Sequence, residues 1–252
     1  MHIDLTGKTV LVTGASRGIG RSLAEGLAGA GATVAVHFNQ SHAAGGALAE
    51  TLGHDARAFQ ADLAEPESCE RLFDEVIGAY GRLDVLVNNA GIALKIPFGV
   101  ATDEWRKAWD LTMAVNLRAV ELLSRLAVQH FQQHDGGRII NVASRAAFRG
   151  DTPEYMSYAA SKGGVVSLTR SIARAFGKAG VCAFVLAPGF VRTEMAQEAI
   201  DEYGEAHVTS DLALDRLTEP ADLTPLVVLL ASGLADHATG TTIDVNAGSY
   251  VR

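Results

Sequence analysis

The 252-residue sequence contains 6 prolines and 2 cysteines, and it lacks long apolar runs. Cys69 and Cys182 lie far apart and outside any metal-ligand spacing, a pattern typical of a reducing compartment and of a protein without a disulfide framework. No stretch approaches the roughly 18 uninterrupted apolar residues of a membrane-spanning helix. The first residues form neither the basic nor the apolar region of a signal peptide, so a cytoplasmic protein is expected.

Basic charge is also scarce. Lysine and arginine together number 21 against 29 acidic residues, which gives a net charge of −8 and no basic run. A nucleic-acid partner requires a basic stripe, so none is expected. Glycine, by contrast, is abundant at 26 residues. Since these glycines follow no triplet period and apolar residues make up 48% of the chain, collagen-like and disordered classes are excluded.

Short apolar strands alternate with longer helical stretches along the chain. Strands are expected at 8–13, 33–38, 56–60, 83–87, 138–143, 181–186 and 241–245. Helices are expected at 18–30, 43–52, 66–79, 155–176 and 221–232, in one or two pieces over 102–134, and not over the less regular segment 189–217. Several strands are apolar throughout, as a sheet covered on both faces requires. This order predicts a Rossmann-type, doubly wound, mostly parallel seven-stranded sheet with helices on both faces, in a single domain over residues 1–252.

A glycine-rich turn, Thr13 to Gly20, follows the first expected strand and opens the first expected helix. In a doubly wound fold, backbone amides and the helix N-terminus at this position bind a dinucleotide pyrophosphate. Gly14 permits the turn, Gly18 lets the backbone approach the ligand, and Gly20 lets helix and strand pack closely. An ordinary glycine turn is the alternative interpretation.

Residues 13–20 match in full the Thr-Gly-x3-Gly-x-Gly motif of the short-chain dehydrogenase/reductase family. Three further motifs follow in the family's order: Asn88-Asn89-Ala90-Gly91, Tyr158-Ala159-Ala160-Ser161-Lys162 and Pro188-Gly189-Phe190-Val191-Arg192-Thr193. The chain thus resembles this family over nearly its whole length. The resemblance implies hydride transfer between a nicotinamide cofactor and a carbonyl or carbinol carbon. It places the cofactor contacts at Gly14, Ser16, Arg17, Gly18, Ile19, Gly20, Asp62, Leu63, Asn89, Ala90, Gly91, Tyr158, Lys162, Pro188, Gly189, Val191 and Thr193.

The choice of cofactor depends on the end of the second strand. An NAD-preferring site offers a carboxylate there to the ribose 2′-hydroxyl, whereas this chain has Phe38. Arg17 can supply positive charge to a 2′-phosphate, so NADP(H) is favoured over NAD(H). Arg17 is alternatively a solvated loop arginine. Asp62 matches the family residue that binds the adenine amino group, and is alternatively an aspartate of a turn or N-cap.

The chemistry is expected to depend on four residues, which the resemblance groups as a catalytic tetrad: Asn116, Ser144, Tyr158 and Lys162. Tyr158 and Lys162 lie four apart on an expected helix, hence on one face, and the ammonium is expected to lower the pKa of the phenol. Tyr158 then acts as the general acid/base, and Ser144 hydrogen-bonds the reacting oxygen. Tyr155 competes as a candidate, but its i+4 residue is Ala159. Asn116 is alternatively a buried amide or the cause of a helix kink.

Substrate contacts are expected from three loops at the carboxyl edge of the sheet, 93–100, 145–154 and 190–217. Apolar side chains in these loops or directly beside them are Ile96, Phe98, Phe148, Met156, Phe190 and Met195. Arg145 and Arg149 offer a site for an anionic substrate group, but the sequence favours the alternative, solvated loop arginines.

The ending Val245-Asn246-Ala247-Gly248-Ser249-Tyr250 resembles that of 3-oxoacyl-acyl-carrier-protein reductases, which gives one alternative function. The basic positions with which those enzymes dock the acidic carrier fall at Asp135 and Ala179, which weakens that interpretation. A catalytically silent nucleotide-binding scaffold is the alternative from another class. The resemblance also implies a homotetramer or homodimer, a small carbonyl or alcohol substrate and no metal.

Overall fold

The computed structural model describes residues 3–251, apart from the side chains at 195, 198, 199, 202, 203 and 207. It contains one seven-stranded sheet, in which all six strand pairings are parallel. The strands are β1 (Thr9–Val12), β2 (Thr33–Phe38), β3 (Arg57–Gln60), β4 (Val85–Asn88), β5 (Gly137–Val142), β6 (Val181–Pro188) and β7 (Thr242–Val245). Their spatial order, β3-β2-β1-β4-β5-β6-β7, confirms the doubly wound, Rossmann-type prediction.

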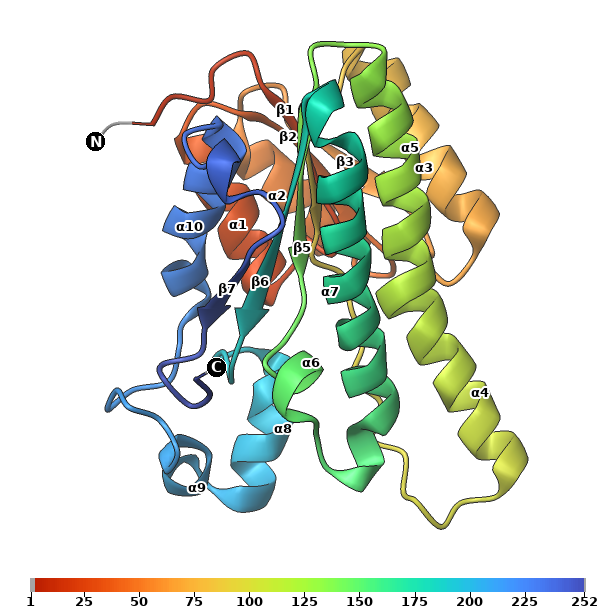
Figure 1. The fold of residues 1–252 in the computed structure, drawn as a ribbon, viewed down its shortest axis with the longest axis vertical. Helices are drawn as coiled ribbons and strands as arrows, with labels where there is room; N and C mark the ends of the chain where they lie inside the picture. Colours follow the sequence, from red (N-terminus) through yellow and green to blue (C-terminus); the bar gives the residue numbers. More distant parts are fainter. Residues whose placement is uncertain (1–2, 252) are drawn as a thin grey trace.

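Helices cover both faces of the sheet (Figure 1). They are α1 (Gly18–Gly29), α2 (His42–Leu52), α3 (Pro66–Tyr80), α4 (Thr102–Met113), α5 (Ala119–Gln132), α6 (Ala146–Arg149), α7 (Met156–Phe176), α8 (Glu194–Tyr203), α9 (Glu205–Thr209) and α10 (Pro220–Ser232). Within residues 3–251, no helix is both long enough and apolar enough to span a bilayer.

The core has two layers because successive strand residues point to opposite faces. Val10 and Val12 pack with Leu23 of α1 and Leu223 of α10, in the layer that α2 completes. Leu11, on the other face of β1, belongs to the layer of α3, α5 and α7. Every residue of β1 and β4 is buried, which explains why these strands are apolar apart from Thr9 and Asn88 at their ends.

The crossover from β3 to β4 places β4 on the far side of β1, so the winding direction changes between these two strands. Ligands of open parallel sheets bind in the crevice outside the carboxyl ends of the strands at such a switch point. The turns that follow β1 and β4 therefore border the expected cofactor site.

Three parts of the fold differ from the sequence prediction. The stretch expected as one or two helices over 102–134 is interrupted by a π-helical turn, Ala114–Arg118, between α4 and α5. The segment 189–217, expected to be irregular, contains α8 and α9, and α6 was not expected either. Helix α8 is amphipathic, but it follows an extended Thr193 and is interrupted after ten residues by Gly204, so the sequence offers a weak signal.

Candidate active site

The glycine-rich turn between β1 and α1 is as tight as the sequence predicts. Gly14 has a φ of +64°, and a Cβ added there would lie 2.9 Å from Cα of Ala90. A Cβ on Gly20 would lie 2.2 Å from the carbonyl oxygen of Gly14 and 2.5 Å from Nδ2 of Asn89. Neither position accepts a side chain without a backbone shift, so both glycines are required by the close approach of β1, α1 and the turn after β4.

The first turn of α1 is suited to a pyrophosphate. Arg17 is the extended N-cap residue and makes no side-chain capping bond, and Gly18 has a φ of +54°. The first backbone amides of a helix have no intrahelical partner, so here they can bind an anion. Ile19 lines the adjoining cavity, and Ser16 is half-buried in the turn. The residues present therefore fit a dinucleotide.

The turn after β4 is bound to the glycine turn by side-chain hydrogen bonds. Nδ2 of Asn89 donates to the carbonyl oxygens of Thr13, at 2.9 Å, and Gly14, at 3.2 Å. The hydroxyl of Thr13 accepts from the amides of Asn89 and Ala90, both at 3.0 Å. A Cβ on Gly91 would lie 3.2 Å from Nζ of Lys162, so this glycine leaves space beside the lysine.

A buried histidine that the sequence analysis did not single out holds the same turn from the other side. Nδ1 of His37 accepts a hydrogen bond from the amide of Gly14 at 3.0 Å, and Nε2 lies 3.1 Å from the carbonyl oxygen of Ala61. These partners require the neutral tautomer with its proton on Nε2. Burial lowers the pKa of His37 to about 4, so the ring is neutral at physiological pH. No local motif marks this residue, because its partners follow β1 and β3.

The end of β2 carries no carboxylate. The ring of Phe38 is buried against α2, where a Cβ on Gly45 would lie 2.4 Å from it. Arg17 is exposed and forms an ion pair with Glu194, the first residue of α8. The guanidinium is thus accessible at the cofactor end of the site, although a carboxylate already neighbours it.

Asp62 and Leu63 follow β3. Oδ1 of Asp62 accepts a hydrogen bond from the amide of Ala64 at 3.0 Å. This contact agrees with the alternative interpretation of Asp62 as an aspartate that stabilises a turn. Leu63 is buried beneath this turn. An adenine contact of Asp62 stays a prediction.

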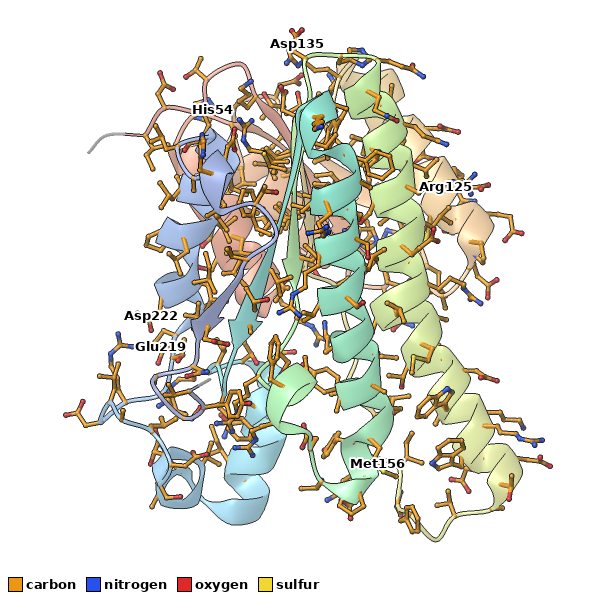
Figure 2. All side chains as sticks on the ribbon, in the orientation of Figure 1. His54, Arg125, Asp135, Met156, Glu219 and Asp222 are labelled. Carbon is orange, nitrogen blue, oxygen red and sulfur yellow. The ribbon has the colours of Figure 1, made fainter. Side chains whose placement is uncertain are left out.

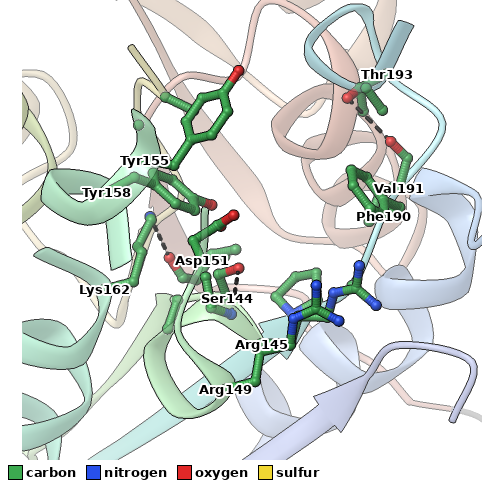
Figure 3. A pocket seen from close by; sticks show the side chains of 18 of the residues that line it. Ser144, Arg145, Arg149, Asp151, Tyr155, Tyr158, Lys162, Phe190, Val191 and Thr193 are labelled. Atoms are coloured by element: carbon green, nitrogen blue, oxygen red, sulfur yellow. Dashed lines mark hydrogen bonds between the residues drawn. The ribbon is translucent and has the colours of Figure 1, made fainter. Parts of the chain in front are cut away.

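Ser144, Tyr158 and Lys162 line one cavity of about 630 Å³ at the carboxyl edge of the sheet (Figure 3). Ser144 follows β5, while Tyr158 and Lys162 lie one turn apart in the first part of α7. Nζ of Lys162 donates to the carbonyl oxygen of Val142 at 2.9 Å. The strand end and the helix are thereby fixed to each other next to the phenol.

The pKa of Tyr158 differs from the expectation. Burial raises the pKa of the phenol above its usual value, and a hydrogen bond with Ser144 offsets this only in part. Burial also lowers the pKa of Lys162, to about 8. The expected lowering of the Tyr158 pKa by Lys162 is wrong for this structure, because loss of water at both groups dominates. The phenol of Tyr158 therefore carries its proton at neutral pH.

Asn116 lies in the π-helical turn and is fully buried. Its Oδ1 accepts from the amide of Ile92, and its Nδ2 donates to the carbonyl oxygen of Ile92, both at 2.8 Å. Nδ2 also donates to Oγ of Ser161 at 3.1 Å, on the helix that carries the tyrosine and lysine. Asn116 thus connects the strand-end loop to α7. It does not line the cavity. Both alternative interpretations of Asn116 apply, since its amide is buried and it lies where the helix is irregular.

The last residue of β6 and the segment that follows it complete the cavity wall. Pro188, Gly189, Val191 and Thr193 all line it. A Cβ on Gly189 would lie 2.9 Å from Cβ of Asn246, and one on Gly18 would lie 3.3 Å from Cγ2 of Thr193. The glycine turn and the start of α8 therefore meet across the site.

The predicted cofactor residues do not all reach the cavity. The predicted residues that are outside its lining are Gly14, Ser16, Arg17, Gly18, Gly20, Asp62, Leu63 and Ala90. These residues lie in the turns after β1, β3 and β4, along the crevice where the adenosine and pyrophosphate parts of a dinucleotide are expected.

All three predicted substrate loops contribute to the cavity, but with more charge than expected. Lys95, Arg145, Arg149, Asp151 and Asp211 line it together with Phe190. Phe98 is 72% exposed and is not part of the lining; the side chain of Met195 lies outside the described residues. The preferred interpretation of Arg145 as a solvated loop arginine is wrong, because its residue is 6% exposed and lines the cavity.

Comparison with known proteins agrees with this geometry. A model of the short chain dehydrogenase family matches residues 8–204. The 3-oxoacyl-acyl-carrier-protein reductase FabG of Vibrio harveyi is 36% identical over 250 residues, which cover 99% of this chain and 100% of the relative. A blue fluorescent protein from a metagenomic library, solved in complex with NADPH, is 34% identical with a TM-score of 0.90, over 98% of this chain and 100% of that one. A proposed NAD(P)-dependent gluconate 5-dehydrogenase of Beutenbergia cavernae, with NADP bound at low occupancy, is 36% identical with a TM-score of 0.89, over 99% of each chain.

Proposed function

The chain belongs to the short-chain dehydrogenase family, and from this premise we propose that it is an NADPH-dependent reductase that interconverts a ketone and a secondary alcohol. Family membership makes it an NAD(P)-dependent oxidoreductase acting on CH–OH and C=O groups. The observation that supports the proposed chemistry is the convergence of Ser144, Tyr158 and Lys162 on one cavity beside the glycine turn. We propose that residues 1–252 act as one such catalytic domain.

Each residue has a distinct part in this proposal. NADPH, when bound, supplies a hydride to the carbonyl carbon. Tyr158, whose pKa is raised by burial, donates its proton to the carbonyl oxygen as that oxygen gains negative charge. The hydroxyl of Ser144 hydrogen-bonds the same oxygen. Lys162 is held at Val142 beside the tyrosine, and Asn116 positions the loop at Ile92 and the helix at Ser161.

The preference for NADP(H) rests on two features of the crevice. Phe38 stands where a 2′-hydroxyl-binding carboxylate would repel a 2′-phosphate, and the exposed Arg17 offers a guanidinium to that phosphate. Two structural neighbours were solved with NADPH or NADP. Glycine-turn residues 14–20 would hold the pyrophosphate, and the segment from Pro188 to Thr193 would border the nicotinamide.

The proposal is tested by following NADPH oxidation with a panel of ketones. Tyr158→Phe removes the proton donor but keeps the ring, so kcat should fall about a thousandfold. Tyr155→Phe is the matched control, since Tyr155 also lines the cavity but has Ala159 four residues on. Its kcat should stay within a few-fold of the parent value. Equal activity of parent and Tyr158→Phe would contradict the mechanism, and no activity on any carbonyl or alcohol would favour the nucleotide-binding scaffold.

A second candidate function is reduction of 3-oxoacyl groups on acyl carrier protein, which the 36% identity to a full-length FabG favours. Asp135 argues against it, because it puts an exposed carboxylate where those enzymes have a basic docking position. Figure 2 shows Asp135 at one end of the molecule and Met156, the first residue of α7, at the opposite end. Turnover of a 3-oxoacyl group on the carrier at least tenfold faster than on a small thiol would support the carrier substrate.

Self-association and a cytoplasmic location complete the proposal. Helix α4 has stacked rings of Trp105 and Trp109, with centroids 5.0 Å apart, and Leu111 is 43% exposed. Such apolar surface on α4 supports pairing of two copies, as in the homotetramers that the family resemblance implies. Light scattering after size exclusion tests it, and a monomer at micromolar concentration would contradict it.

A further inference from the structure

Arg145 directly follows Ser144 in the sequence. It lines the cavity and is only 6% exposed. Its guanidinium lies 4.8 Å from the ring centroid of Phe190, which also lines the cavity. Burial lowers the pKa of Arg145, yet a guanidinium stays charged at any physiological pH. A buried cation is costly unless it is paired, so the site has a reason to hold an anion there.

Arg149 adds a second guanidinium one helical turn further on. Both arginines point into the cavity on the Phe190 side of Ser144, whereas Asp151 lies toward Tyr158 (Figure 3). Nη1 of Arg145 and Nη1 of Arg149 bind one atom, Oδ2 of Asp211, at 3.3 and 3.2 Å. Each contact is a single long hydrogen bond, although a guanidinium can make two parallel bonds to a carboxylate.

Asp211 belongs to the segment after α9, and its side chain is 45% exposed. Its carboxylate occupies the position that an acidic group of a bound molecule would take between the two guanidiniums. Because it is half-exposed and lies in a connecting segment, it can be exchanged for another carboxylate at low cost. Asp151 adds negative charge that acts on both Tyr158 and Arg145, whereas Arg145 and Arg149 bring two positive charges together at Asp211, so an anionic group is favoured between the two arginines.

We propose that Arg145 and Arg149 form a carboxylate-binding subsite, and that the substrate is an oxo acid whose carboxylate displaces Asp211. This inference rests on the proposed ketone reduction and adds the substrate class to it. The carbonyl of such a substrate would lie at Ser144 and Tyr158, and its acidic end would lie beneath Phe190.

The test compares an oxo acid with its neutral primary amide, using the ratio of their kcat/KM values with NADPH. The parent should prefer the acid by at least tenfold, since a charge-assisted pair is lost in the amide. Arg149→Gln should lower this ratio about tenfold. Asp211→Asn should raise it, because the competing carboxylate is gone, whereas a purely structural Asp211 would lower both rates together. Arg174→Gln, an exposed arginine in the last turn of α7, is the control and should leave the ratio unchanged.

Arg145→Gln gives the larger expected loss, but because this residue is buried the variant must first show parent-like circular dichroism. Arg149→Gln keeps the inference testable if it does not, since its side chain is 39% exposed. If the parent turns over the oxo acid and its amide with equal kcat/KM, and neither Arg149→Gln nor Asp211→Asn changes this ratio, the carboxylate subsite is overturned. The proposed ketone reduction is unaffected by that result. A phosphorylated ketone preferred over the oxo acid overturns the carboxylate as the acidic group. Turnover of neither acid nor amide, nor of any other ketone, overturns the proposed function itself.

Discussion

The ring of His37 accepts a hydrogen bond from the backbone amide of Gly14 at 3.0 Å, so a buried side chain of β2 fixes the first glycine of the cofactor turn. The opposite ring nitrogen donates to the carbonyl oxygen of Ala61, after β3. One neutral imidazole thus joins three neighbouring strand ends at the part of the crevice where adenosine is expected. Its burial leaves it about 2% exposed, so water cannot replace either partner.

His37→Ala should both destabilise the fold and weaken the cofactor site. Two buried backbone groups lose their partner and a cavity forms, so the free energy of unfolding should fall by about 2–4 kcal/mol. The dissociation constant for NADPH should rise as well, because the glycine turn loses its support. Urea unfolding and a fluorescence titration measure the two effects.

His130 provides the matched control. Its Nε2 accepts from the amide of Leu83 at 3.1 Å, but this contact precedes β4, at the opposite end of the sheet. His130→Ala should lower stability by about 1 kcal/mol and leave NADPH binding unchanged. Equal effects of the two variants on NADPH binding would show that His37 has no specific role at the turn.

Acid should destabilise the protein through His37 well before its carboxylates titrate. The folded pKa of about 4 lies below the ordinary value of 6.5, so between these pH values the unfolded chain binds a proton that the folded chain does not. The free energy of unfolding therefore falls as the pH falls through this window, by up to roughly 3 kcal/mol. Urea unfolding at pH 7 and pH 4.5 measures it.

His37→Gln should flatten this pH dependence. The decline will not vanish, because burial also lowers the pKa of His130, which contributes with the same sign. Asp84 acts at lower pH: burial raises its pKa, but hydrogen bonds from Arg82 and Thr9 outweigh burial and hold the pKa below its usual range. Its stabilisation is lost only below about pH 4. An identical pH dependence in parent and His37→Gln would refute the assignment to His37.

Arg17 and Glu194 should have opposite effects on cofactor choice. If the Arg17 guanidinium binds the 2′-phosphate, Arg17→Gln raises the dissociation constant for NADPH about tenfold and leaves that for NADH nearly unchanged. Glu194→Gln removes the competing carboxylate, so NADPH should bind a few-fold tighter. Titrations with both cofactors give the comparison.

Arg21→Gln controls for the loss of an exposed charge on the same helix, since Arg21 pairs with Glu25 one turn further along α1. It should change neither dissociation constant. A parallel loss of NADPH and NADH affinity in Arg17→Gln, or clearly tighter NADH binding in the parent, would overturn the NADP(H) preference.

The features that the sequence predicts correctly are those that residues close together in the chain determine. The order of apolar strands and amphipathic helices was enough for the doubly wound sheet, because the inner strands β2, β1, β4, β5 and β6 are largely buried and amphipathic helices cover both faces of the sheet. Gly14, Gly18 and Gly20 were recognisable because the turn fixes their spacing. The pairing of Tyr158 with Lys162 follows from helix periodicity alone.

Contacts between distant segments were beyond prediction. Gly14 is 23 residues from His37, and Arg145 is 66 residues from Asp211, so neither pair leaves a local pattern. The burial that raises the pKa of Tyr158 depends on the several segments that pack around it, and no single segment reveals it. The side chain of Asn116 bonds to the backbone of Ile92, and Asn116 itself lies in the π-helical turn that the sequence pattern did not resolve.

The number of glycines does not show which of them close packing requires. The same substitution to alanine, made at two helical glycines, distinguishes a required glycine from a replaceable one. Gly46 in α2 has nothing within 4 Å of an added Cβ, so Gly46→Ala should raise the free energy of unfolding by about 0.5–1 kcal/mol through helix propensity. Gly20 in α1 gains the same propensity, yet its Cβ would lie 2.2 Å from the carbonyl oxygen of Gly14. Because that atom belongs to the backbone of the cofactor turn, Gly20→Ala should lower stability by about 2–3 kcal/mol and weaken NADPH binding. Thermal unfolding with and without NADPH measures both variants, and a stabilising Gly20→Ala would show that α1 and the turn do not pack as closely as the geometry requires.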